Sequence, residues 1–348
     1  MRHLVLAALI LAWPALAAAQ HWATREVCTV DTPAIHADLF TAPGIDALRE
    51  QARQIPNNTG RYWQITAPSG AVSHLHGTFH TSDRHILDLP PRVRADIARS
   101  RLVAVEVDFT APTRRHIRAL GDRDQIWRDA RSNFKFDTVG LPPRITSMIR
   151  SRTSGLGWTP EAPDYLTFGG LAELLLPDPC SDFTAGVIPF QDALIQTLGH
   201  IAGADLLGLE PRDAFRATLD RRDRQDTAIA ILAVYGAYLT PMTDNRPRAT
   251  NIAMYLRGEL GLMSLTDRAF LQTQFGQADG SQLQSIVDDY MLRERNETFL
   301  ATARDALDTG GVFMAIGSAH LPGTTGMIEL LRAAGFTVTR IPLPGEAP

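Results

Sequence analysis

The chain has 348 residues, which is enough for one large domain or two of ordinary size. Hydrophobic residues make up 45% and charged residues 21%, proportions typical of a globular protein with a sizeable core. The net charge is −4, and the scattered arginines form no basic stripe with interleaved aromatic residues. The composition therefore argues against nucleic acid as a partner.

The first segment, MRHLVLAALILAWPALAAAQ, has the three parts of a secretory signal peptide. Arg2 supplies a positive start, residues 4–13 form an apolar run, and Ala17-x-Ala19 forms a small-residue cleavage site. We expect cleavage after Ala19 and a mature protein that is periplasmic or secreted, with an N-terminal membrane anchor as the alternative. No later apolar run is long enough to span a bilayer, so no transmembrane segment is expected in the mature chain.

The chain contains two cysteines, Cys28 and Cys180. In an oxidising compartment an isolated pair forms a disulfide more often than a metal site. We therefore predict a Cys28–Cys180 bond, which would join the start of the mature chain to its middle.

The first third of the mature chain predicts an α/β unit. Residues 45–55 have the spacing of a short helix, and two strands, at 62–66 and 71–77, flank a hairpin turn at APSG. A helix that begins at Pro90-Pro91 then leads to an alternating strand at 101–109. The order strand, helix, strand is typical of α/β folds.

The middle of the chain, from about residue 114 to 307, is mostly helical in pattern. One short apolar segment at 204–210 interrupts it and predicts a further strand. The last helix of this region, at 283–307, is followed by Gly310 and Gly311, which are stop signals.

The chain closes with a strand at 312–317, a helix at 325–335 and a strand at 336–342. We therefore predict a single α/β domain over residues 20–348. Its central mixed sheet is built from N- and C-terminal segments, and it carries the large helical middle.

Two strand ends carry the same motif, Gly-x-x-His, which ends at His80 in HGTFH and at His320 in AIGSAH. If both strands share one sheet, the two histidines can lie side by side at its edge, where α/β sheets place their chemistry. Glu106 adds a carboxylate in an otherwise apolar strand, and a buried carboxylate needs a partner. Imidazole and carboxylate together suit Zn, Mn, Fe or Co, so these residues predict a divalent-metal site.

Structural explanations stay open for the same residues. A histidine at a strand end is usually a satisfied polar residue, and a glutamate in a strand usually pairs with arginine. His76 has the same strand parity as His80 and is a reserve ligand, whereas His74 is expected to be peripheral.

Several blocks of the sequence, in order, resemble the TraB/GumN family, which includes the PrgY and Tiki proteins. They are HGTFH (His76–His80), VAVEVD (Val103–Asp108), GLE (Gly208–Glu210), RERN (Arg293–Asn296) and the segment Ala315–Val338. The resemblance implies a core related to the erythromycin-esterase and ChaN-like group. Animal Tiki members are metal-dependent peptidases, so the resemblance also implies a divalent metal, with Mn or Co favoured and Zn possible.

The resemblance also implies roles for individual residues. His80 and His320 would be metal ligands, and Glu106 would be a third ligand or the base that acts on bound water. Arg295 would stabilise a developing oxyanion, and Asn296 would help to position it.

Two further acidic residues have structural roles in this interpretation. Proline follows Glu210, where the family more often has threonine, so Glu210 is expected to close the core or cap a helix. Asp192 is expected to support the neighbouring strand and to have no catalytic role.

The sequence thus predicts a periplasmic or secreted metal-dependent hydrolase that acts on a peptide or protein. The alternatives are a non-catalytic periplasmic binding protein of the same fold, with a peptide or polysaccharide-related ligand, and a protein whose metal is only structural. The sequence has no clear heptad repeat or long exposed apolar edge from which to infer an oligomer.

Overall fold

The computed structural model describes residues 23–40, 44–108, 135–184 and 187–348 of the chain. The described strands form one six-stranded sheet with the order β4-β3-β5-β2-β1-β6. Their bounds are β1 Tyr62–Thr66, β2 Val72–Thr78, β3 Leu102–Val105, β4 Asp205–Gly208, β5 Val312–Gly317 and β6 Thr337–Arg340. The predicted signal peptide, residues 1–19, lies outside the described residues, as do residues 114–134 of the predicted helical middle.

Segments from both ends of the chain share this sheet, which confirms the predicted α/β architecture. β5, near the C-terminus, lies between β2 and β3 and pairs in parallel with both. β4, from the helical middle, adds a fourth parallel strand beside β3. β1 pairs antiparallel with β2 through the predicted hairpin and with β6 at the edge. The sheet is therefore mixed, with its four parallel strands grouped together.

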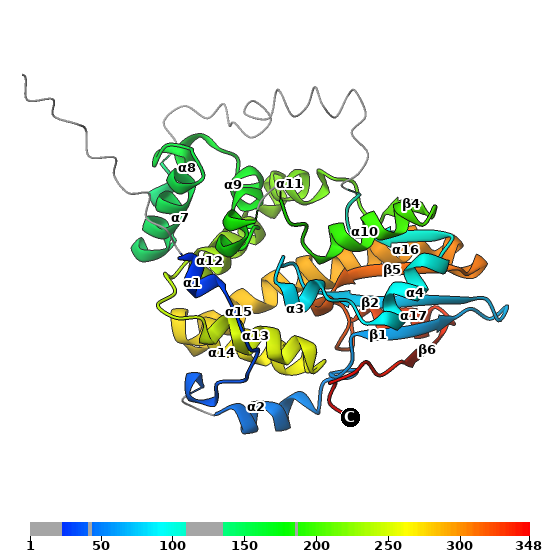
Figure 1. Ribbon diagram of the computed structural model, residues 1–348. Coiled ribbons are helices and arrows are strands. Elements are labelled where there is room, and N and C mark those ends of the chain that lie inside the picture. Colours follow the sequence, from blue (N-terminus) through cyan, green and yellow to red (C-terminus); the bar gives the residue numbers. More distant parts are fainter. Residues whose placement is uncertain (1–22, 41–43, 109–134, 185–186) are drawn as a thin grey trace, which may run out of the picture.

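Different helices cover the two faces of the sheet, because successive side chains of a strand point to opposite faces. Val103 and Phe313 pack in a hydrophobic cluster with side chains of α4 and α10. Ala104 and Met314 belong to the cluster on the other face, with side chains of α16 and α17. Both faces of the parallel strands are buried, as is usual in parallel sheets, and the four helices flank the sheet in Figure 1.

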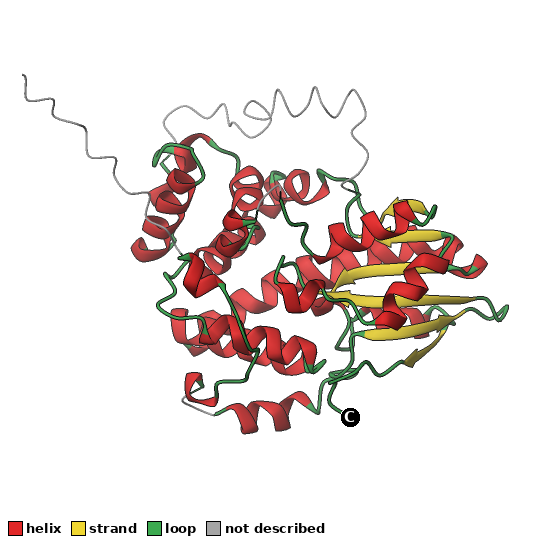
Figure 2. Ribbon diagram, viewed as in Figure 1, coloured by secondary structure: helices red, strands yellow, loops and turns green. Residues whose placement is uncertain are grey.

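Helices connect the strands and form most of the described middle of the chain. Their bounds are α1 Arg25–Cys28, α2 Ile45–Ala52, α3 Arg84–Leu87, α4 Pro91–Arg99, α7 Pro143–Gly155, α8 Ala162–Tyr165, α9 Phe168–Leu175, α10 Gln191–Ile201, α11 Ala214–Leu219, α12 Gln225–Tyr238, α13 Arg246–Leu256, α14 Leu260–Phe275, α15 Gln277–Asp288, α16 Arg295–Thr309 and α17 Met327–Ala333. Many of the middle helices pack around a separate hydrophobic core that includes Ile149, Leu171 and Ile231. Figure 2 shows these helices beside the sheet.

Several elements differ slightly from their predicted bounds, and two differences lie next to the candidate site. The strand predicted at 101–109 ends at Val105, which lies opposite Gly208, the last residue of β4. The helix predicted at 283–307 is interrupted by a π-helical turn at Asp289–Glu294. Such turns are frequent at functional sites, and this one immediately precedes Arg295.

The predicted pairing of the two cysteines is confirmed, since their sulfur atoms lie at disulfide-bonding distance. Cys28 ends α1, and Cys180 lies in a short 3₁₀ helix at Pro179–Phe183. The bond therefore joins the N-terminal segment to the chain that leads into α10. In the described part of the chain, no helix is both long enough and apolar enough to cross a membrane.

Removal of the disulfide is expected to destabilise the fold. Cys28 and Cys180 are 152 residues apart in sequence, so the bond restricts a long loop of the unfolded chain, and its loss is expected to lower the free energy of unfolding by about 2–5 kcal/mol. Urea unfolding of the oxidised protein, with and without reductant, measures this difference. The Cys28→Ser/Cys180→Ser double variant is the control, because reductant should not change its stability. Alkylation of both thiols in protein purified without reductant would contradict the bond.

Candidate metal centre

The candidate site lies at one edge of the sheet, where four neighbouring parallel strands end. His80 follows β2, Glu106 follows β3, Glu210 follows β4 and His320 follows β5. Because the carboxyl ends of parallel strands meet at the same edge, residues far apart in the chain come together there. The predicted grouping of both Gly-x-x-His motifs at one sheet edge is therefore observed.

Glu106 is at the centre of this group. Its Oε1 atom lies 3.7 Å from Nε2 of His80 and 3.7 Å from Nε2 of His320. The same oxygen accepts a hydrogen bond of 2.6 Å from the backbone N–H of Gly317. Two imidazoles thus face one buried carboxylate oxygen from different strands.

The glycines of the two Gly-x-x-His motifs have different structural roles. A Cβ atom on Gly317 would lie 3.1 Å from both Glu106 Oε1 and His80 Nε2, so a side chain here would intrude on the site. A Cβ atom on Gly77 would lie 2.9 Å from a side-chain atom of Leu321 and 3.1 Å from Cα of Ser318. Gly77 therefore lets β2 pack closely on the turn after β5, which brings the two motifs together.

His80 is oriented by a residue whose role the sequence analysis missed. Nδ1 of His80 lies 2.8 Å from Oδ2 of Asp192, and the hydroxyl of Thr78 donates to Oδ1 of Asp192 at 2.7 Å. Asp192 lies in the first turn of α10, on the helical segment that packs over β3. Its sequence surroundings contain no motif, so only the packing of α10 on the sheet identifies this contact.

His320 is oriented by Asn296. Nδ1 of His320 lies 2.8 Å from Oδ1 of Asn296, whose Nδ2 donates to the backbone carbonyls of His320 and Thr325. Because the amide oxygen faces the ring, Nδ1 carries the hydrogen, and Nε2 presents its lone pair toward Glu106. Asn296, expected to position Arg295, thus contacts His320.

Arg295 lies between two carboxylates. Its Nη2 donates to Oε2 of Glu106 at 2.6 Å and to Oε1 of Glu210 at 2.5 Å, while its Nε donates to both oxygens of Glu210. The guanidinium carbon lies 5.0 Å from the ring centre of Phe299, a distance typical of a cation–π contact. Glu210 therefore has a partner inside the site and shares the guanidinium group of Arg295 with Glu106.

The charges of these groups are strongly coupled. Burial disfavours an ionised Glu106, but Arg295 and the two histidines outweigh it and hold the pKa of this carboxyl well below its usual value. The surrounding protein atoms oppose charge on His80, whose side chain is 56% exposed, but Asp192 and Glu106 raise the pKa of this ring to about 9. Burial and the nearby Arg295 lower the pKa of His320 to about 3. At neutral pH and without a metal, these values describe an ionised Glu106, a protonated His80 and a neutral His320; metal binding would displace the Nε2 proton of His80.

Burial raises the pKa of Glu210, and its bonds to Arg295 oppose this shift. The two glutamates that share Arg295 therefore differ in how strongly they hold a proton. Such a separation of pKa values between neighbouring carboxyl groups is common where one of them acts as an acid or base.

Three residues of the described chain offer ligand atoms that all lie within 4.8 Å of one another, namely His80, Glu106 and Asp192. His320 faces the same Glu106 oxygen but is not a member of this compact group. Imidazole nitrogens and carboxylate oxygens are suitable ligands for a divalent transition metal, so the donor set fits the predicted cation. His80 and Glu106 are common to both candidate ligand sets, and the third candidate ligand is either His320 or Asp192.

His76, the reserve ligand of the sequence analysis, does not reach the site. Its fully buried ring packs near Tyr62 and Phe313, with ring centres 5.9 and 6.2 Å apart. Neither ring nitrogen has a hydrogen-bond partner among the described residues, and burial lowers the pKa of this ring to about 3. His74 is peripheral, as expected, with its ring stacked on Tyr62.

A cavity of about 230 Å³ adjoins the loop that follows His80. Ser82 and Asp83 of this loop line it together with the disulfide, Ile188 and Arg248. Arg248 also donates to the hydroxyl of Thr81, the residue next to His80, at 2.7 Å. A bound group in this cavity would therefore lie close to the candidate centre.

The fold and the site together define a mixed α/β protein with a candidate cation site at the carboxyl ends of its parallel strands. The model of the TraB/PrgY/gumN family matches residues 62–340, which include all six described strands and the residues of the site. The chain therefore belongs to the TraB/PrgY/gumN family, as its motifs predicted. A comparison with curated proteins and another with solved structures each found no match.

Loss of Arg295 is expected to destabilise the protein. Arg295→Ala would leave the carboxylates of Glu106 and Glu210 buried together without their shared cation, which is expected to cost about 3–5 kcal/mol. Urea denaturation measures the change in the free energy of unfolding.

Arg293→Ala is the matched control for this measurement. Arg293 is two positions away, is more exposed and pairs with Asp289 and Glu297 on the surface, so its loss should cost less than about 1 kcal/mol. Equal effects of the two substitutions would show that Arg295 does not balance the buried carboxylates.

Proposed function

We propose that this protein is a metal-dependent hydrolase that acts on a peptide or protein in the periplasm or outside the cell. The convergence of two imidazoles on one oxygen of Glu106, at the carboxyl ends of three parallel strands, carries the proposal. The disulfide is compatible with an oxidising compartment.

In this proposal His80, His320 and Glu106 hold the cation. The Nε2 atom of each histidine lies 3.7 Å from Oε1 of Glu106, so the three side chains would share one cation. Asp192 and Asn296 would orient the imidazoles, because each contacts the Nδ1 atom of its histidine and leaves Nε2 for the metal. Mn or Co is favoured by the family resemblance, and Zn is possible.

A bound divalent metal would lower the pKa of water and polarise a carbonyl group of the substrate. The residues of the chain would then contribute proton transfer and charge stabilisation. Glu106 would accept a proton from the attacking water at its carboxylate. Arg295 bonds to the two glutamates through Nε and Nη2, so its Nη1 group would donate to the substrate oxygen as negative charge develops.

The cavity beside Ser82 and Arg248 would receive part of the substrate. It combines the apolar side chains of Phe183 and Ile188 with polar groups of Asp83 and Arg248. A mixed lining of this kind suits a peptide segment, which offers side chains of both types.

Metal content tests the ligand assignment. His80→Ala and His320→Ala are expected to lose nearly all bound metal, and Asp192→Asn is expected to weaken metal binding by about 10–100-fold. Elemental analysis of protein purified without chelator, followed by titration with Mn(II), measures both effects. His200→Ala is the control, because His200 is exposed and lies outside the site.

Two results would change the ligand set. Equal metal content in the unmodified protein, His80→Ala and His320→Ala would refute the assignment. Loss of metal from Asp192→Asn with full content in His320→Ala would make Asp192 the third ligand instead.

Digestion of a peptide library with added Mn(II), Co(II) or Zn(II) tests the catalytic role. Glu106→Gln is expected to lower turnover by at least about 10²–10⁴-fold, because the amide cannot accept the proton. Thermal unfolding checks that the variant is folded. Binding of a peptide or polysaccharide-related ligand, unchanged in Glu106→Gln and without cleavage by the unmodified protein, would support a binding protein instead.

A further inference from the structure

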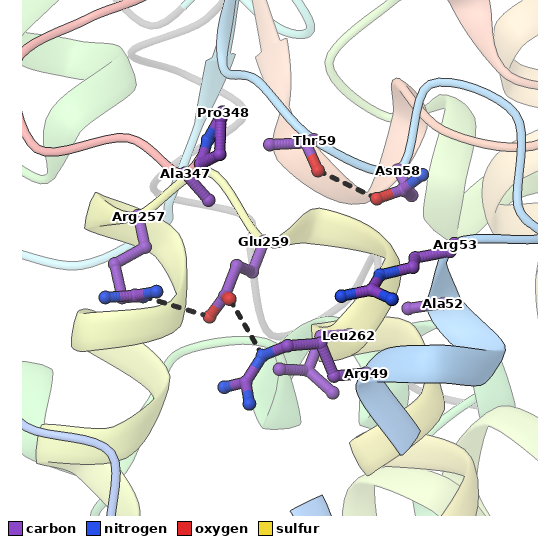
Figure 3. Close-up of a pocket in the computed structure, with 10 residues that line it drawn as sticks. All are labelled: Arg49, Ala52, Arg53, Asn58, Thr59, Arg257, Glu259, Leu262, Ala347 and Pro348. Carbon is purple, nitrogen blue, oxygen red and sulfur yellow. Dashed lines mark hydrogen bonds and ion pairs between the residues drawn. The ribbon is translucent and has the colours of Figure 1, made fainter. Parts of the chain in front are cut away.

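A second cavity, of about 500 Å³, lies where the end of α2 meets the junction of α13 and α14. Its lining residues are Arg49, Ala52, Arg53, Asn58, Thr59, Arg257, Glu259, Leu262, Ala347 and Pro348. None of them belongs to the candidate metal centre. Figure 3 shows three arginine side chains around the carboxylate of Glu259.

Glu259 holds two of these arginines in place. Its side chain is only 7% exposed, and its two oxygens accept separate bonds, from Nε of Arg49 at 3.0 Å and from Nε of Arg257 at 3.2 Å. Each guanidinium group has five N–H donors, so both arginines keep donors beyond this contact. The third, Arg53, forms no bond to the other lining residues drawn in Figure 3.

The lining side chains carry more positive than negative charge. Three arginines face the carboxylate of Glu259, and the terminal residue Pro348 adds a second carboxylate to the lining, which leaves a surplus of one positive charge. Asp46 and Glu50 pair with Arg49 and Arg53 at distances of 2.8 and 2.5 Å, but both acids are highly exposed. Pairs of this kind are weakened by water and salt, so they compensate the surplus only in part.

The base of the cavity is rigid. Leu262 and Ala52 are buried beneath the polar groups. The backbone N–H of Gly261 donates to the carbonyl of Asn58 at 2.8 Å, and a Cβ atom on Gly261 would lie only 2.6 Å from Cβ of Asn58. Close packing of this glycine therefore fixes the loop at Asn58 against the start of α14, so the walls keep their spacing.

We propose that this cavity binds a small anionic ligand that carries phosphate or carboxylate groups. Guanidinium groups recognise both oxyanions through paired N–H donors, and their fixed arrangement around Glu259 provides several such donors within one cavity. The volume is in the range of small-molecule sites. This site is separate from the proposed hydrolase function and does not depend on it.

Calorimetric titration with inorganic phosphate, and in parallel with succinate, tests this site. The unmodified protein is expected to bind at least one of them saturably. Arg53→Ala and Arg257→Ala are each expected to weaken binding by about tenfold or more, because each removes charged donors. Binding of phosphate alone would identify a phosphorylated ligand, and binding of both would identify an anion recognised by charge.

Two control variants separate this site from other anion binding. Arg144→Ala removes an exposed arginine that bonds to Gln274 and Thr240, outside the cavity, and should leave affinity unchanged. His320→Ala should also leave the affinity unchanged. If a metal at the candidate centre held the phosphate instead, this variant would lose phosphate binding. Absence of saturable binding, equal affinity in Arg53→Ala, Arg257→Ala and the unmodified protein, or loss of binding in His320→Ala would overturn the proposal. Circular dichroism confirms that each variant is folded, and Arg53→Ala is the safest variant because its side chain is largely exposed.

Discussion

The buried charge of Glu106 is the constraint on which the site depends. A carboxylate removed from water needs positive or hydrogen-bonding partners, and removal of one partner leaves an uncompensated charge. Glu106 has Arg295, the backbone N–H of Gly317 and the rings of His80 and His320 around it. These partners come from a helix and from two other strand ends, so the charge balance of one side chain links segments from the whole chain.

A residue of a helix contacts the Nδ1 atom of each histidine near Glu106. Asp192 of α10 contacts His80, and Asn296 of α16 contacts His320. Both helices also pack on the sheet, α10 on one face and α16 on the other. The hydrophobic core therefore sets the positions of the polar groups, because these helices cannot shift without losing buried contacts. A polar network with most of its members satisfied in this way is expected to be rigid.

Much of the fold was predictable because strands and helices have different hydrophobic periods. The strand at 62–66 has its predicted bounds, and the helix at 283–307 ends at its predicted glycines. Two features of that helix and its neighbours were not predictable. The π-helical turn before Arg295 has no local sequence signal, and β3 ends where its partner strand ends, which depends on a segment about 100 residues away.

The secondary-structure elements, the family and the two histidine motifs could be predicted from the amino-acid sequence, because they depend on neighbouring residues and on a recognisable order of blocks. The contacts of Asp192 with His80, of Asn296 with His320 and of Arg295 with two glutamates are visible only in the folded chain. Asp192 and His80 are 112 positions apart in the chain, and Asn296 and His320 are 24 positions apart. Contacts at such separations are set by how helices pack on the sheet, and no local pattern of side chains records that packing.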